Sequence, residues 1–62
     1  MSDLVRIEWQ DVSGRWHIVT RTINSPTIIK ARFNEVLRNQ KNAVKVRAVD
    51  NKTDLLVDIQ QR

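Results

Sequence analysis

Two stretches of the chain alternate apolar and polar residues with a period of two, and each stretch is interrupted once. Residues 5–18 carry the first alternation, which breaks at Asp11-Val12-Ser13-Gly14, and residues 44–57 carry the second, which breaks at Asp50-Asn51-Lys52-Thr53. A period of two is typical of a β-strand with one buried face, and a polar break led by Asp is typical of a turn. The pattern therefore predicts two β-hairpins of similar design.

The segment between the two hairpins has the periodicity of a helix. Ser25 is a typical capping residue, and Pro26 fits the first helical turn, where its missing N–H is not needed. The stripe expected to face the core consists of Ile29, Phe33, Val36, Leu37 and Gln40. We expect one domain over residues 1–62, with a hairpin at about 4–22, a helix at about 26–40 and a hairpin at about 43–60.

The length of the first turn decides which residues of the first hairpin share a face. A four-residue loop ending in Gly14 places glycine where such loops need a left-handed residue. The pairs of this register are Gln10 with Arg15, Trp9 with Trp16, Ile7 with Ile18 and Val5 with Thr20. A change of one residue in the length of the loop would set Trp9 opposite His17 and place the two tryptophans on different faces of the sheet. The four-residue loop is therefore preferred.

The second hairpin follows the same scheme. Its predicted inner and turn pairs are Val49 with Asp54, Ala48 with Leu55, Val46 with Val57 and Val44 with Ile59. On the other face, Lys45 is expected opposite Asp58 and Arg47 opposite Leu56. Thr53 lacks the conformational freedom of glycine, so Asn51 is the candidate for any positive φ in this turn.

These elements predict an α+β fold, a two-layer ββαββ sandwich in which one helix packs on one face of a four-stranded antiparallel sheet. Numbered along the chain, the strand orders 2-1-3-4 and 1-2-4-3 both keep every neighbouring pair antiparallel, and the sequence does not choose between them. The expected core of the sheet consists of Val5, Ile7, Trp9, Trp16, Ile18, Val44, Val46, Ala48, Leu55, Val57 and Ile59.

Charge and composition narrow the classes of partner. The 62 residues carry a formal net charge of +4, with 11 Lys and Arg against seven Asp and Glu, which favours anionic partners. The absence of cysteine fits a reducing cytoplasm. Residues 1–4 lack the basic segment and apolar run of a secretory signal, and no stretch approaches the roughly 20 apolar residues that span a bilayer. We expect a cytoplasmic protein with no membrane partner.

An enzymatic function has little support in the sequence. The chain has one His, no Cys and no Tyr, and the best acid–base constellation is Glu8 opposite His17 on the outward sheet face. Such a pair on an exposed hairpin is usually a surface hydrogen bond, and a single imidazole makes a poor transition-metal site. We expect no catalytic residues, no metal, no cofactor and no small-molecule substrate.

The outward face of the sheet is the candidate binding surface. The predicted register directs five basic side chains there, joined by the one His, so that the candidate contacts to a partner or nucleic acid are Arg6, Arg15, His17, Arg21, Lys45 and Arg47. These groups fit a phosphate backbone. Nucleic-acid-binding sheets usually expose aromatic rings, however, and both tryptophans are predicted in the core, which disfavours recognition of single-stranded bases.

Apolar residues are also expected on this outward face. Val19 and Leu56, with Leu4 and Val49 beside them, project where a monomer would prefer polar groups. A domain of this size buries little apolar surface, so a second copy would add burial. Val19 and Leu56 are therefore the candidate apolar interface of a homodimer that forms by stacking sheet faces or pairing edge strands.

The segments Val46-Arg47-Ala48-Val49-Asp50 and Leu56-Val57-Asp58-Ile59, with the first turn Asp11-Val12-Ser13-Gly14-Arg15-Trp16, resemble short uncharacterised proteins encoded by bacteriophages and prophages. The resemblance implies a bacterial cytoplasm and an accessory role, and it brings no functional residues. The leading hypothesis is a small non-enzymatic binding or regulatory module that contacts a macromolecular partner through the outward sheet face. The alternative is a nucleic-acid-binding (DNA-binding) accessory protein that uses the same basic surface.

Overall fold

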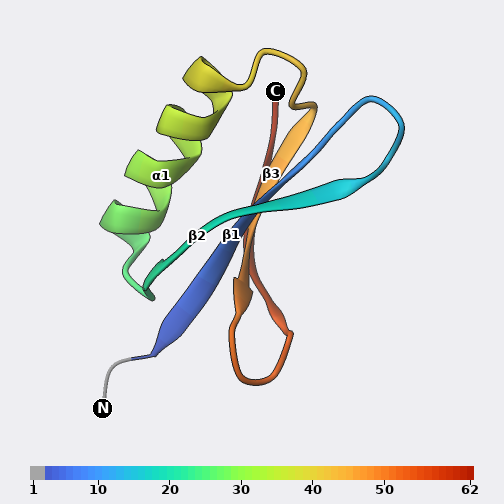
Figure 1. Cartoon of the computed structure of the whole chain (residues 1–62). Coiled ribbons are helices and arrows are strands. Elements are labelled where there is room, and N and C mark those ends of the chain that lie inside the picture. Colours follow the sequence, from blue (N-terminus) through green and yellow to red (C-terminus); the bar gives the residue numbers. More distant parts are fainter. Residues whose placement is uncertain (1–2) are drawn as a thin grey trace.

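The computed structural model describes residues 3–62. Met1 and Ser2, on which part of the expectation about a secretory signal rests, lie outside this range. The elements along the chain are β1 (Leu4–Gln10), β2 (Trp16–Ile23), α1 (Pro26–Asn39), β3 (Lys45–Asp50) and β4 (Leu56–Gln61). Helix α1 lies along one side of the twisted strands, and the β1–β2 and β3–β4 turns lie at opposite ends of the sheet (Figure 1). The predicted α+β fold is confirmed.

The strands form one antiparallel sheet in the order β2-β1-β3-β4, the first of the two orders compatible with the sequence. The two central strands, β1 and β3, carry the sheet's contribution to the core: Val5, Ile7, Val46 and Ala48 are fully buried. Ile29, Phe33 and Val36 of α1 pack on them from one side. The strands with the most regular apolar alternation therefore lie in the middle of the sheet, under the helix.

The two ends of α1 are held differently. Ser25 is the N-cap residue and Pro26 occupies the first turn, both as predicted, but the Ser25 side chain makes no capping hydrogen bond. At the other end, the Arg62 guanidinium donates to the carbonyl oxygens of Leu37, Gln40 and Ala43 at 2.7, 2.8 and 2.7 Å. These carbonyls include orphan acceptors at the helix C-terminus. The chain after β4 therefore caps the helix.

The predicted register of the first hairpin is wrong by one residue. Trp9 lies opposite His17, because the Asp11 amide bonds the Arg15 carbonyl at 2.9 Å and leaves a three-residue loop. Gly14 adopts the positive φ expected of it, at 90°. A bulge then interrupts the pairing of β1 with β2, so that Ile7 lies opposite Thr20. The even-numbered residues of β2 before the bulge therefore lie on the same sheet face as the odd-numbered residues after it.

The predicted register of the second hairpin is also wrong. The Asp50 amide bonds the Leu55 carbonyl at 2.8 Å, and Val49 lies opposite Leu56 instead of Asp54. The residue with positive φ in this turn is Asp54, at 62°, not Asn51. A bulge between this pair and the next sets Ala48 opposite Asp58, and the observed pairs further along are Arg47 with Ile59, Val46 with Gln60 and Lys45 with Gln61.

The edge strands consequently lie mostly outside the core. Ile18, Val44, Leu55, Val57 and Ile59, all expected in the core, are exposed, and Trp16 is half-buried on the opposite face. A helix is about 10 Å wide and strands are about 4.8 Å apart, so one helix is narrower than a four-stranded sheet. Helix α1 packs mainly over β2, β1 and β3, and β4 lies beyond it. Apolar residues of β4 therefore gain little burial by facing the helix.

Candidate binding surface on the sheet

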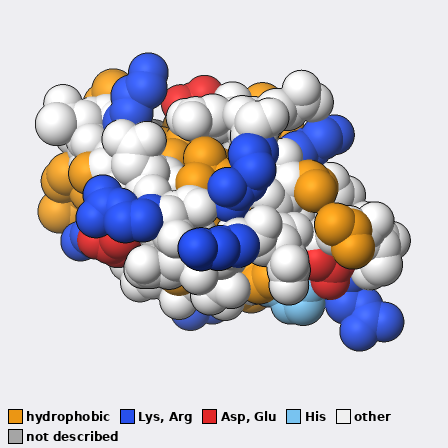
Figure 2. Space-filling model, turned by 90° about the horizontal axis from the view of Figure 1, so that it is seen from above, with side chains coloured by type: hydrophobic (Ala, Val, Ile, Leu, Met, Phe, Trp, Pro, Cys, Tyr) orange, Lys and Arg blue, Asp and Glu red, His pale blue; other side chains and the backbone are white. Residues whose placement is uncertain are grey.

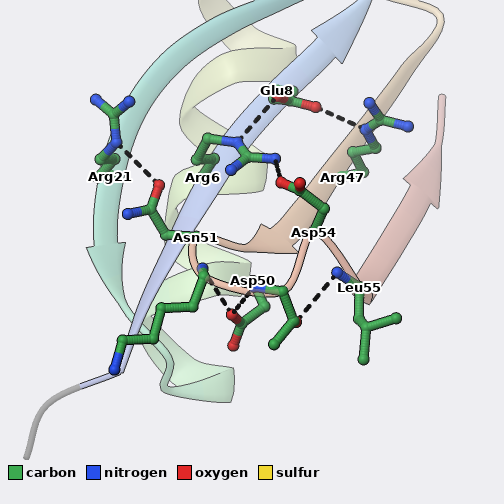
Figure 3. Close-up of polar contacts among 10 residues, drawn as sticks. Arg6, Glu8, Arg21, Arg47, Asp50, Asn51, Asp54 and Leu55 are labelled. Carbon is green, nitrogen blue, oxygen red and sulfur yellow. Dashed lines mark hydrogen bonds and ion pairs between the residues drawn. The ribbon is translucent and has the colours of Figure 1, made fainter.

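The sheet face opposite α1, called here the outer face, is the candidate functional surface. Figure 3 shows part of it, with the strands in front and the helix behind. The pairings place three rows of side chains across it, which are Arg21-Arg6-Val49-Leu56, Ile18-Glu8-Arg47-Ile59 and Trp16-Gln10-Lys45-Gln61. No other element of the chain from residue 3 onward covers this face.

A ladder of ion pairs runs across the centre of the outer face. Glu8, only 6% exposed, accepts from Arg47 Nε at 2.7 Å through Oε1 and from Arg6 Nε at 3.4 Å through Oε2. Arg6 also donates through Nη2 to Asp54 Oδ1 at 2.6 Å (Figure 3), and this hydrogen bond raises the pKa of the Arg6 guanidinium. A carboxylate this deep needs such partners, because burying an unpaired charge is costly. The ladder therefore holds both arginines in place.

Trp16 also helps to position Arg47. The Arg47 guanidinium carbon lies 3.8 Å from the centre of a Trp16 ring, which is cation–π distance. The sequence prediction put Trp16 in the core beside Trp9, and the register change is what brings it to the outer face instead. Glu8 and Trp16 thus hold one guanidinium from two sides, which restricts its orientation.

Apolar side chains lie on both sides of the ion-pair ladder. Five large ones on the outer face are between 42% and 58% exposed, namely Leu4, Ile18, Ile23, Leu56 and Ile59. On the β4 side an open hollow is lined by Arg6, Arg47, Val49, Asp54, Leu56 and Ile59. We call this the outer hollow. It combines two guanidinium groups with aliphatic walls.

Four of the six predicted polar contacts lie on the outer face, namely Arg6, Arg21, Lys45 and Arg47. Arg21 donates through Nε to Asn51 Oδ1 at 3.1 Å, which links β2 to the second turn (Figure 3). Arg15 lies in the first turn, immediately before β2. The strand pairing therefore gathers predicted basic residues of three strands on one surface.

His17 is not on the outer face, and the expected Glu8–His17 pair does not form. Glu8 lies opposite Ile18, while His17 stacks on Trp9 at 4.4 Å between ring centres. His17 Nε2 lies 2.8 Å from Asp11 Oδ2. Figure 2 shows the pale blue His beside an acidic side chain, on a surface where Lys and Arg are interspersed with hydrophobic groups. The histidine thus belongs to the first hairpin's own packing.

The predicted apolar contacts are both exposed. Leu56 lines the outer hollow, and Val19 is the extra residue at the bulge of β2. Sequence reasoning missed Trp16, Ile18 and Ile59 as outer-face residues, because a one-residue change in a loop or a bulge reverses the face of every residue beyond it. No local signal in the alternation marks the bulges.

Both turns begin with an Asp that accepts hydrogen bonds from the turn itself. Hydrogen bonds from Ser13 and His17 hold the pKa of Asp11 well below its ordinary value. The Thr53 and Lys52 amides donate to Asp50 Oδ1 at 2.9 and 2.8 Å and lower the pKa of Asp50. The repeated Asp at the start of each sequence break is thus a repeated turn device.

Other kinds of site receive no support from the described residues. Within residues 3–62, no three His, Cys, Asp or Glu side chains gather as a metal site would require. In the same range, no helix has the length and apolar character needed to cross a membrane. Comparison of the chain with protein-family models, with curated proteins and with solved structures gave no match in any of the three. The resemblance to short phage-encoded proteins therefore stays a prediction.

Proposed function

We propose that the protein is a small non-enzymatic binding module that holds a macromolecular partner on its outer face. One observation carries the proposal: five large apolar side chains, each about half exposed, flank a part-buried Arg–Glu–Arg ladder on a sheet face that no other described element covers. Exposed apolar patches on small soluble domains usually mark interaction sites. Arg and Trp, both present here, are enriched in protein interfaces.

The ladder makes this surface suited to binding. Because Glu8 and Trp16 hold Arg47, and Glu8 and Asp54 hold Arg6, little side-chain freedom remains to be lost when a partner docks. The non-enzymatic part of the proposal rests on His17, which packs on Trp9 and Asp11 instead of forming an acid–base pair with Glu8. The cysteine-free composition fits a cytoplasmic location.

Site-specific photo-crosslinking in the host cell tests the proposal. A photo-reactive residue is placed at Ile59, on the outer face, or at Arg38, an exposed position on α1. We expect discrete cross-linked products from position 59 and not from position 38, at equal expression and equal melting temperature. Products of the same kind and yield from both positions would contradict an outer-face binding module.

Nucleic-acid binding is the second candidate function, and the basic side chains of the outer face support it. Arg21, Lys45 and Arg47 lie on one face of a chain with a net charge of +4. Against it, Arg47 covers a face of the Trp16 ring and Trp9 stacks on His17, so the rings are poorly placed for base stacking. Titration of duplex and single-stranded DNA over a salt series decides, because phosphate contacts require a steep loss of affinity with salt.

Homodimerisation is a further part of the proposal. The exposed apolar residues of β4 support it, because this edge strand presents unpaired backbone groups beside Leu56 and Val57. Sedimentation and a concentration series of thermal melts test it, since a dimer's melting temperature rises with protein concentration. A monomer at all concentrations, with a constant melting temperature, would contradict it.

A further inference from the structure

We propose that the outer hollow binds an acidic protein segment in which carboxylate and aliphatic side chains alternate along one face. This inference rests on the proposed function and names the chemistry of the partner. The lining of the hollow carries it: the guanidinium groups of Arg6 and Arg47 lie beside the exposed aliphatic groups of Leu56 and Ile59.

The charge of the outer face selects an anionic occupant. Among the described residues of the outer face, four cationic side chains, Arg6, Arg21, Lys45 and Arg47, stand against one carboxylate, Glu8, and Asp54 reaches Arg6 from the bordering turn. Arg47 uses Nε for Glu8, and within residues 3–62 its two terminal nitrogens have no hydrogen-bond partner. Its side chain is 31% exposed, so these nitrogens are available to an incoming carboxylate.

Asp54 already shows how a carboxylate binds in this hollow. Its side chain is 73% exposed, yet Oδ1 accepts from Arg6 Nη2 at 2.6 Å. Asp54 sits in the β3–β4 turn at a φ of 62°, in the left-handed region where Asp and Asn are enriched among residues other than glycine. A surface ion pair of this kind contributes little free energy. A carboxylate from a partner would therefore replace Asp54 on Arg6 at small cost.

The spacing across the strands fits an extended segment. Ile59 is one strand from Arg47, and Leu56 is two strands from Arg6, with buried Val49 between them. These separations correspond to about 5 and 10 Å. Side chains two residues apart on an extended chain are about 7 Å apart and point the same way. Acidic and aliphatic residues at alternate positions can therefore reach both kinds of group.

The apolar walls argue for protein over nucleic acid in this hollow. A phosphate backbone could pair with the arginines but would leave Leu56 and Ile59 in contact with water or with its own charges. A second copy of the chain bound face to face would bring the basic side chains of the two outer faces together, and like charges in contact are unfavourable. An acidic segment with aliphatic side chains satisfies both parts of the hollow.

The experiment uses the full chain and a fluorescein-labelled peptide, Glu-Ser-Leu-Ser-Glu-Ser-Leu-Ser, followed by fluorescence anisotropy. We expect saturable binding at low salt, and binding about tenfold weaker or more when the glutamates are replaced by glutamine or the leucines by serine. Equal affinity for the three peptides would overturn the inference. So would preference for a thymidine octanucleotide over the acidic peptide.

Variants separate binding from folding. Asp54→Asn keeps a residue that tolerates positive φ and removes the competing carboxylate, so we expect affinity for the acidic peptide to rise about threefold. A gain in affinity cannot come from loss of structure. Leu56→Ser should weaken binding about fivefold. The control Val12→Ser, at a more exposed position in the β1–β2 turn, should leave binding unchanged.

The experiments distinguish failure of the acidic-segment inference from failure of the proposed function. An unchanged or weaker affinity of Asp54→Asn, with peptide binding that ignores Leu56→Ser, overturns the acidic-segment inference. Photo-cross-links from position 59 in that case would still support an outer-face partner of other chemistry. Loss of cross-links from position 59 would instead remove the binding module itself.

Discussion

The substitution Glu8→Gln tests the Arg–Glu–Arg ladder on which the outer face depends. It removes the charge of a carboxylate that is 6% exposed and bonded to Arg47 at 2.7 Å and Arg6 at 3.4 Å. Breaking a buried ion pair costs about 3 to 5 kcal/mol. Arg47 is part-exposed, Arg6 keeps Asp54, and glutamine still accepts one hydrogen bond, so we expect about 2 kcal/mol.

That loss is large for this chain. A domain of 62 residues has a free energy of unfolding of about 3 to 9 kcal/mol. A loss of about 2 kcal/mol lowers the melting temperature by roughly 10 °C in a domain of this size. Urea unfolding followed by circular dichroism and tryptophan fluorescence measures the loss, with the slope against urea as a check that the transition stays two-state.

The matched control is Glu35→Gln. Glu35 is 54% exposed and pairs with Arg32 at 3.3 Å one helical turn away, so its loss should cost less than about 0.5 kcal/mol. A double-mutant cycle with Arg47→Gln should give a coupling free energy of about 1 kcal/mol or more between positions 8 and 47. If Glu8→Gln costs no more than Glu35→Gln, the ladder does not hold the outer face together.

Three further predictions concern the turns, the core and the helix cap. The pKa values of Asp11 and Asp50 are lowered by folding, so their contribution to stability is full above the ordinary aspartate pKa of about 4 and is lost as pH falls below it. Urea unfolding between pH 7 and pH 2 checks this, and the double variant Asp11→Asn and Asp50→Asn should flatten the curve. Phe33→Leu, at a side chain 1% exposed, should cost about 1 to 2 kcal/mol by thermal unfolding, and a neutral result would contradict the assigned core. Arg62→Ala should cost about 1 kcal/mol through the lost C-terminal cap, while the exposed Arg38→Ala should be close to neutral; hydrogen exchange in the last turn of α1 compares the two.

Local interactions made several elements predictable. Helix α1 runs from Pro26 to Asn39 against a prediction of about 26–40, because its apolar stripe and its N-terminal proline act within a few residues. Gly14 adopts the positive φ that its place in the turn suggested, because glycine carries no Cβ. Both hairpins also form at the predicted stretches.

The candidate site was predicted only in part. The sequence placed Arg6, Arg21 and Arg47 on the outer face, and the structure has them there. It misplaced His17 and Trp16, because their faces depend on one residue of loop length. Hairpin loops of three and of four residues are both common, so the turn residues by themselves do not choose between them reliably.

The sequence alone determined the α+β class, the order of elements and the bounds of helix and hairpins, because alternation, helical periodicity and turn residues act over short distances. Tertiary structure decided the strand order, the two bulges and the faces of the edge strands. One helix covers one face of the sheet, so Val5, Ile7, Val46 and Ala48 gain burial on that face, while Ile59, which the second bulge places opposite Arg47, lies on the other face and stays exposed. Because the only helix of the described residues packs on the opposite face, the outer hollow and its arginines stay open to a partner.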